Sequence, residues 1–262
     1  MLSSLKKLME GALVASPILV LDSSAPGSVD GRHLRAAVFQ DVRLQYVTKV
    51  LDETSGKRAA VIGGGLGLLA QGLAHLGMEV TSVDPSPEAT ALARVSDDSG
   101  AVVYSTAPFE RPGLPEGTFD LVYCADTFEI TEDLDAVLAA VARLLRPGST
   151  LIYDTVNRTP ISRLVYLGMF QRVPGTRIMP PGRYSAARLR PPAELADRMT
   201  AHGLTNLDTC SFKPRSVGAL ISATRARRAG RVTDDQLSSM VDFKLDPNGP
   251  PVVTYLGHAR RT

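Results

Sequence analysis

The stretch "AAVIGGGLGLLAQGLAHLGMEVTSVD", residues 59–84, decides the fold of this protein. An apolar run leads into a glycine-rich turn, a helix-like segment follows, and a second apolar run ends at Asp84. Glycines allow a tight turn and let the backbone come close to a ligand. This strand, turn, helix and strand pattern is typical of nucleotide-binding α/β domains.

The spacing within the turn fits two kinds of nucleotide site. Counted from Gly65 the turn is G-x-G-x-x-A, and an acid follows at Asp84, which is typical of nicotinamide and flavin sites. Counted from Gly63 it is G-x-G-x-G, a spacing common in S-adenosylmethionine (SAM) sites. The turn alone does not decide between them.

The same alternation continues on the C-terminal side. Strands are expected at 59–62, 79–84, 101–105, 119–126 and 149–157, with helices at 67–77, 86–96 and 131–148 between them. Short strands that alternate with long helices require crossover connections, so the sheet should be doubly wound and mostly parallel. A helix (191–204), strand-like text (205–212), a helical segment (216–240) and a closing strand (251–261) predict an antiparallel end to the sheet.

Bulk composition indicates a globular protein. The 262 residues are 44% hydrophobic and 21% charged, which excludes disordered and fibrous classes and suits one large domain. Cys124 and Cys210 lie in apolar or mixed stretches of sequence, which predicts that both are buried thiols. Free thiols indicate a reducing compartment, so we expect a cytoplasmic protein. The first 16 residues favour an amphipathic helix over a signal peptide, and later apolar runs are shorter than a membrane span.

Charge is unevenly distributed. The net charge is only +2, yet acids dominate residues 1–156 and arginines dominate residues 157–262. A basic solvated face explains this as well as an anionic partner does. Basic motifs with interleaved aromatics are missing and aromatics make up 5% of the chain, so we do not expect a nucleic-acid partner.

Several polar or glycine-rich segments directly follow predicted strands. In an open parallel sheet, ligands bind beyond the carboxyl ends of the strands. Gly63, Gly65 and Gly67 follow the first strand, and Asp84, with Pro85 after it, ends the second, where a carboxylate can accept both ribose hydroxyls. The segments "STAPFE" (105–110) and "CADTFE" (124–129) complete a ring of loops around one pocket.

The text "GTFDLVYCADTFEITEDLDAVLAAVARLLRPGSTLIYDTVNRTP" (117–160) resembles the class I SAM-dependent methyltransferases, in particular the ubiquinone-biosynthesis O-methyltransferase type. "RLLRPGSTL" matches the end of the helix before the fifth strand, and "DTVNRTP" matches the end of that strand. "DVRLQYV" (41–47) is similar to the segment that carries an arginine for the methionine carboxylate. The resemblance extends over about residues 40–262 and implies a seven-stranded Rossmann-like sheet with an antiparallel last strand.

The resemblance also implies roles for single residues. Arg43 would pair with the SAM carboxylate, as suits a bidentate guanidinium. Gly63 and Gly65 would line the methionine end and Asp84 would hold the ribose. Ala107 would lie near the adenine, and Ala125 near the methionine or ribose.

Two positions depart from the family pattern. Val61 stands where the family usually has an acid at the end of the first strand, so the resemblance implies that one hydrogen bond of about 1.5–3 kcal/mol to the SAM ammonium is missing. Its loss would weaken SAM binding about tenfold or more, unless another acid or a backbone carbonyl replaces it. The family's divalent-cation cluster of two acids and a histidine keeps Asp126 and Glu129, but Ile130 replaces the histidine. Two carboxylates with waters can still hold Mg²⁺.

These observations predict methyl transfer from SAM to an oxygen of a small aromatic or quinone-like acceptor. Asp126 and Glu129 are expected to act as metal ligands or as the base, with His33 as a substitute base. Residues 1–40 form a helical lid segment, 41–262 the SAM-binding domain, and 157–192 a lid on the acceptor side. In that lid Met169, Phe170, Met179 and Tyr184 suit an apolar acceptor, while Arg172, Arg177 and Arg183 suit an anionic one.

Two other functions remain open at this level. A SAM-type fold that has lost methyl transfer would catalyse another reaction or act as a binding module, as the apolar Val61 and Ile130 allow. A nicotinamide or flavin oxidoreductase rests on the glycine fingerprint alone. Homodimerisation and peripheral membrane contact are not decided by the sequence.

Overall fold

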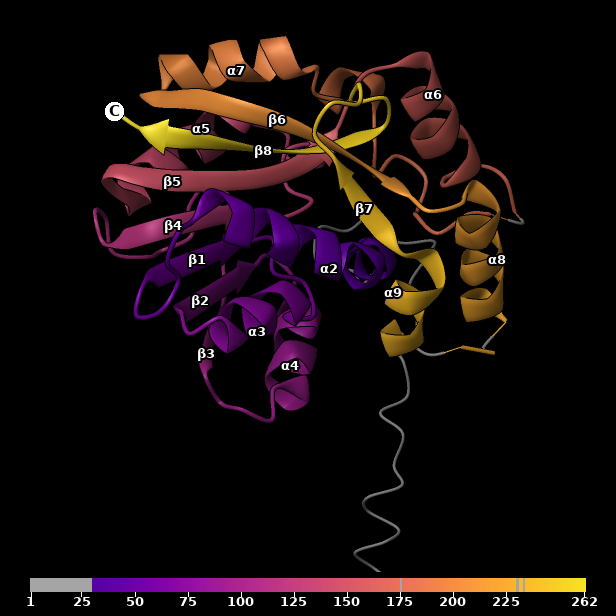
Figure 1. Ribbon diagram of the computed structural model, residues 1–262, viewed down its shortest axis with the longest axis horizontal. Coiled ribbons are helices and arrows are strands. Elements are labelled where there is room, and N and C mark those ends of the chain that lie inside the picture. The colour runs from indigo at the N-terminus through magenta and orange to yellow at the C-terminus, as the bar shows by residue number, and fades with distance from the viewer. Residues whose placement is uncertain (1–29, 175, 230, 233) are drawn as a thin grey trace, which may run out of the picture.

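The computed structural model describes residues 30–262 except residues 175, 230 and 233 (Figure 1). The helix predicted within residues 1–16 lies outside the described residues. The first described helix, α2 (Arg32–Val50), runs without a break across the boundary predicted at residue 40.

An eight-stranded sheet runs through the molecule in the order β3-β2-β1-β4-β5-β8-β6-β7. The five N-terminal strands are parallel, and the last three add antiparallel pairs: β5 with β8, β8 with β6, and β6 with β7. The predicted doubly wound sheet with an antiparallel end is confirmed. The parallel strands are β1 (Arg58–Ile62), β2 (Glu79–Asp84), β3 (Val102–Thr106), β4 (Phe119–Cys124) and β5 (Leu145–Val156).

The crossover helices are α3 (Leu68–His75), α4 (Pro87–Ser96) and α5 (Leu134–Leu144). Their starts follow the sequence signals: the Ser86 hydroxyl accepts the Ala89 N–H at 3.0 Å, and Asp133 accepts the Ala136 N–H at 2.9 Å. Such caps satisfy N–H groups that the first helical turn leaves without a partner. The helix α4 begins shortly after β2, at Pro87, whereas a loop of nine residues separates the end of β4 at Cys124 from the start of α5 at Leu134.

The structure differs from the prediction in three ways. The helix predicted at 131–148 ends at Leu144, and residues 145–148 belong to β5, because Pro147 cannot continue a helix. The helical segment 216–240 is two helices, and a short edge strand brings the strand count to eight instead of seven. The edge strand was not predicted because its four residues, "FKLD", are too few to show the alternating pattern of a strand. The elements are α6 (Pro160–Ser162), η1 (Arg163–Met169), η2 (Ala186–Arg188), α7 (Pro192–Ala201), β6 (Leu204–Pro214), α8 (Val217–Arg228), α9 (Asp234–Val241), β7 (Phe243–Asp246) and β8 (Thr254–Arg261).

The core lies on both faces of the sheet. Successive strand residues point to opposite faces, so Ala59 and Val61 join a cluster with α2 and α3, while Ala60 and Ile62 join one with α5 and α7. Cys124 and Cys210 are buried free thiols, as predicted. No helix in the described part of the chain is long and apolar enough to cross a bilayer.

Candidate functional site

The glycine turn lies at the carboxyl end of β1, beside the end of β2. Gly63, Gly65 and Gly67 have φ values of 80°, 52° and 84°, in the left-handed region that favours glycine. Asp84 ties the two strand ends together: its carboxylate accepts the N–H of Gly65 and the N–H of Ser86, both at 2.9 Å. The turn is therefore fixed by backbone geometry and by one buried acid.

The three glycines are needed for different reasons. A Cβ on Gly63 would lie 2.4 Å from the Ala125 carbonyl oxygen, and one on Gly67 would lie 2.8 Å from the Tyr104 hydroxyl. A Cβ on Gly65 would meet no atom within 4 Å. Gly63 and Gly67 thus serve packing, whereas Gly65 faces open space in which a ligand can approach the backbone.

A small cavity borders this turn. Of the predicted site residues, the structure brings Gly63, Gly65, Ala125, Asp126, Arg43 and His33 together in its lining, with Asp30, Arg32, Ala36, Gly64, Leu66, Leu69 and Ala89. Its volume is about 30 Å³. Gly67, Asp84, Pro85 and Ala107 are not in the lining, although the Ala107 N–H binds the Asp84 carbonyl at 3.2 Å.

A cluster of buried charges lies next to the cavity. One nitrogen of Arg43 donates to Asp126 and to Asp154, each at 2.7 Å. Arg35 forms ion pairs with Asp126 at 2.7 Å and with Glu129 at 2.8 Å. All five side chains are at least 94% buried. Their charges are therefore stabilised by the ion pairs within the cluster rather than by contact with water.

The cluster shifts the pKa values of its acids in opposite directions. Burial alone would raise the pKa of Asp126, but Arg35 and Arg43 outweigh it and hold that pKa below its usual range. Burial raises the pKa of Asp154 to about 7, because Arg43 compensates it only in part and Asp126 adds repulsion. Asp126 is thus a poor proton acceptor, and Asp154 titrates near neutrality.

The two predicted metal ligands are close together but do not fit a Mg²⁺ site. Both oxygens of Asp126 contact guanidinium groups, and Glu129 accepts from Arg35 and from the Thr155 hydroxyl, at 2.8 Å each. Arg35 therefore occupies the place between the carboxylates where a cation would have to lie. In the described part of the chain, no group of three or more His, Cys, Asp or Glu side chains is arranged to hold a metal.

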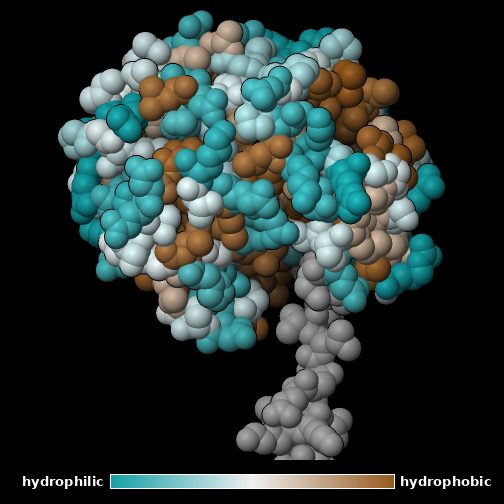
Figure 2. Space-filling model, viewed as in Figure 1, coloured by the Kyte–Doolittle hydropathy of each residue, from teal (hydrophilic) through white to brown (hydrophobic). Residues whose placement is uncertain are grey.

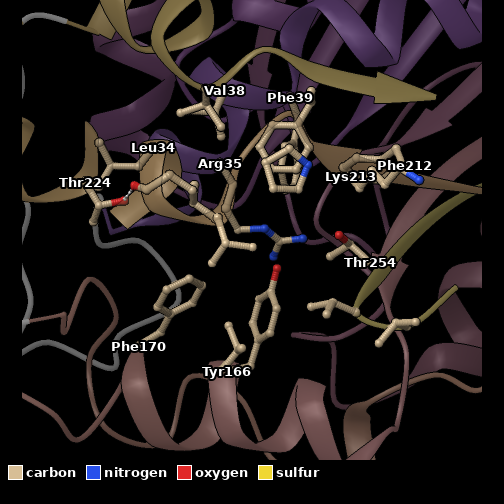
Figure 3. Close-up of a pocket in the computed structure, with 18 of the residues that line it drawn as sticks. Leu34, Arg35, Val38, Phe39, Tyr166, Phe170, Phe212, Lys213, Thr224 and Thr254 are labelled. Carbon is tan, nitrogen blue, oxygen red and sulfur yellow. Dashed lines mark hydrogen bonds between the residues drawn. The ribbon is translucent and has the colours of Figure 1, made fainter. Parts of the chain in front are cut away.

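A second, much larger cavity of about 390 Å³ lies on the other side of Arg35. Its walls come from α2, η1, β6, α8, α9 and β7 and are mainly apolar, with Phe39, Phe170, Ile178, Phe212 and Leu220 among them. Figure 3 shows the Arg35 guanidinium projecting into the middle of this cavity, between Tyr166 and Thr254. Arg35 thus lines the large cavity while its partner Asp126 lines the small one.

The mouth of the large cavity is apolar. Ile161, Val217 and Val252 line it and are 51%, 66% and 37% exposed. Figure 2 shows hydrophobic surface over α6 and η1, where Leu164 is also exposed. Exposed apolar surface next to a cavity is typical of a binding site for an apolar molecule.

The predicted lid residues divide between lining and packing. Phe170 lines the large cavity, whereas Met179 is fully buried in the core. The buried Tyr184 hydroxyl accepts an Arg35 N–H at 2.9 Å. Arg183 forms an ion pair with Asp30 at 2.6 Å, which fastens the lid to the segment over the small cavity.

Sequence reasoning missed Arg35 and Asp154, and it assigned Tyr184 to an apolar acceptor pocket, whereas the Tyr184 hydroxyl accepts from Arg35. Asp154 lies within the quoted "DTVNRTP", directly after an apolar run, and an acid at that position could have been identified as a candidate site residue. Arg35 lies about two helical turns before Arg43 on α2, and the neighbouring residues in the sequence do not distinguish it from a surface arginine. Only tertiary contacts identify it.

Comparison with known proteins decides the family. A family model described as a methyltransferase domain matches residues 60–153, from β1 to β5. A ubiquinone biosynthesis O-methyltransferase of Xanthomonas oryzae pv. oryzae is 35% identical over 170 residues, which cover 64% of this chain and 70% of that protein. This chain belongs to the SAM-dependent methyltransferases.

Solved structures agree on the methyltransferase fold. A SAM-dependent methyltransferase of Thermotoga maritima, described as a possible histamine N-methyltransferase, gives a TM-score of 0.60 at 18% identity, covering 88% of this chain and 93% of that one. The magnesium protoporphyrin IX methyltransferase of Synechocystis PCC 6803, solved with bound S-adenosylhomocysteine, gives a TM-score of 0.55 at 18% identity. The match covers 88% of this chain and 84% of that one. Because the chain belongs to a SAM-dependent family, the nicotinamide or flavin alternative falls away.

Proposed function

We propose that this methyltransferase transfers a methyl group from SAM to an oxygen of a small, largely apolar acceptor, aromatic or quinone-like. One observation carries the proposal: Asp126 lines the cavity at the glycine turn, Arg35 lines the large apolar cavity, and the two side chains are 2.7 Å apart. Ligands in the two cavities would meet at this ion pair. The names of the curated relatives support O-methylation of a quinone-like molecule.

The residues around the glycine turn fit SAM. The open space over Gly65 supports an approach of the methionine end to the turn, and Asp84, between the ends of β1 and β2, is the acid that we propose for the ribose. Ala107 is joined to Asp84 through a backbone hydrogen bond, as suits a position near the adenine. The small cavity requires Asp30 to His33 to move outward when the adenosyl group binds.

Arg43 retains the ability to bind the SAM carboxylate. One terminal nitrogen is taken by Asp126 and Asp154, but its buried Nε has no hydrogen-bond partner among the described residues. Val61 is fully buried and apolar, so the family's acid at the end of the first strand has no equivalent there. Asp30 and Asp126, which both border the cavity, are the acids left to face the SAM ammonium.

SAM supplies an electrophilic methyl group on a sulfonium. The protein's part is to align the acceptor oxygen with that methyl, which can account for much of the rate. The apolar walls of the large cavity hold the body of the acceptor and exclude water. Asp126, with its lowered pKa, is a weak base, and His33, which borders the small cavity, remains the predicted substitute.

The test is a pair of glycine variants. Gly65→Ala adds a methyl group in the open space over the turn, so we expect calorimetry to show at least tenfold weaker binding of S-adenosylhomocysteine. Gly56→Ala is the matched control: Gly56 also has positive φ (70°) and free space, but it lies in the loop before β1. Each variant should lose about 1 kcal/mol of stability through left-handed strain. Equal binding by both variants would contradict a SAM site at this turn.

Methyl transfer itself is tested with labelled SAM and a panel of phenols, quinols and their methyl ethers. We expect label in phenols or quinols and none in the ethers, with the same rate in EDTA and in Mg²⁺. Tight binding of S-adenosylhomocysteine without label transfer to any acceptor would favour a SAM-binding protein without methyltransferase activity. A rate that requires Mg²⁺ would contradict the occupation of both acids by Arg35.

A further inference from the structure

Arg35 is placed where the family resemblance puts a divalent cation. Its guanidinium forms ion pairs with Asp126 and Glu129, at 2.7 and 2.8 Å, and its side chain is 4% exposed. The Nε of Arg35 is buried and has no hydrogen-bond partner among the described residues. A buried donor without a partner costs free energy, and a ligand that accepts from it recovers that cost.

We propose that Arg35 takes over the cation's task and binds the acceptor as an oxyanion, so that the acceptor is an apolar molecule ending in a carboxylate or an ionised phenol. This deepens the proposed function and rests on it. The oxyanion would lie against the guanidinium in the middle of the large cavity, beside Thr254, as the view in Figure 3 allows. The apolar body would extend toward the mouth.

Several other polar groups of the large cavity are already engaged. Lys213 and Asp246 form an ion pair with each other at 2.7 Å. The Ser211 hydroxyl donates to the Pro250 carbonyl at 3.1 Å, and Thr224 donates to its own helix at 2.8 Å. Arg35 is therefore the charged lining side chain, among those described, that keeps a donor for a ligand.

An oxyanion also removes the need for a base. Ile130 stands in place of the histidine, and Arg35 and Arg43 hold the pKa of Asp126 low. An acceptor that arrives ionised attacks directly: its oxygen forms a bond to the methyl carbon, the carbon–sulfur bond breaks, and the electron pair remains on sulfur. Anion and sulfonium become a neutral ester or ether and a neutral thioether, and no proton is transferred.

The first test uses the unaltered protein with S-adenosylhomocysteine bound. Calorimetry compares naphthoate with its methyl ester, and para-nitrophenol with para-nitroanisole, so each pair shares an apolar body and differs in charge. We expect each anion to bind at least about tenfold more tightly than its neutral partner. The affinity for para-nitrophenol should rise as the pH passes the phenol's own pKa, while that for naphthoate stays constant there. Preference for naphthoate alone assigns a carboxylate, and preference for both admits phenolates.

Variants of Arg35 identify the binding group. Arg35→Gln should abolish the preference for anions, and Arg35→Lys should restore part of it. The matched control is Arg215→Gln, an exposed arginine outside the lining, which should keep the full preference. If Arg35→Gln fails to fold, the unaltered protein still decides: equal affinity for naphthoate and its ester, together with equal affinity for para-nitrophenol above and below its pKa, would overturn the proposal.

The two proposals can fail separately. Binding of S-adenosylhomocysteine and label transfer to neutral acceptors, without preference for anions, would leave the methyltransferase proposal standing and remove the oxyanion site. Tight binding of naphthoate that depends on Arg35, without label transfer from SAM, would leave the oxyanion site standing and remove the methyltransferase proposal.

Discussion

At the scale of single residues, the buried charge cluster sets the electrostatics beside the glycine turn. Three carboxylates and two guanidinium groups share one buried site, so one acid carries charge in excess. Asp154 can remove this excess negative charge by binding a proton, because burial raises its pKa to about 7. The groups that face it are Arg43, Asp126, Arg35 and Tyr123.

Asp154 should therefore make stability depend on pH. Its pKa is about 7 in the folded protein against an ordinary value of 3.8, so the folded state binds the proton more tightly. The stabilisation is complete below about pH 4 and is lost as the pH rises to about 7. Asp154→Asn removes this titration. From about pH 5 to about pH 8, wild type should lose roughly 1–3 kcal/mol of unfolding free energy relative to the variant.

Denaturant unfolding at a series of pH values measures this difference. The matched control is Asp52→Asn, an exposed aspartate before β1. Its stability relative to wild type should stay constant over the same range. A constant difference for Asp154→Asn as well would mean that Asp154 is ionised throughout, paired with Arg43.

At the scale of elements, α2 connects the two cavities and α8 forms a wall of the larger one. Asp126 and Glu129 follow β4, and Arg35 and Arg43 come from α2, so the site forms only when the helix packs across the strand ends. On α8, Ala223 lines the large cavity and is 1% exposed, whereas Ala219 on the same helix is outside the lining.

A larger side chain on the lining face of α8 should separate acceptor binding from cofactor binding. Ala223→Met fills part of the large cavity, so we expect a severalfold rise in KM for the acceptor with unchanged affinity for S-adenosylhomocysteine. Overpacking should cost about 1–3 kcal/mol of stability. Ala219→Met is the control and should change neither value. A rise in KM with both variants would point to a general effect on α8 rather than on the cavity.

At the scale of the whole molecule, the parallel half carries the glycine turn and the antiparallel half carries most of the large cavity, in which we propose that the acceptor binds. The N-terminal end of α2 closes over the turn between them. We therefore expect cofactor binding to change the dynamics of the chain first at Asp30 to Ala36, the part that borders the small cavity.

Hydrogen exchange measures this response. S-adenosylhomocysteine should slow exchange of the amides in residues 30–36, because a bound ligand fixes the start of α2 from the turn side. Residues 52–57, before the amino end of β1, provide the internal control and should exchange unchanged. Protection of 52–57 without protection of 30–36 would place the cofactor at the wrong edge of the sheet.

The sequence by itself determined the parallel sheet, its helices, the glycine turn and Asp84, because these depend on local periodicity and on backbone geometry at single glycines. The charge cluster was decided only by the tertiary structure. Arg35 meets Glu129 across 94 residues and Tyr184 across 149, and Arg43 meets Asp154 across 111. Such contacts leave no local pattern, since they arise when a helix packs over strand ends and traps its arginines among acids that water no longer reaches.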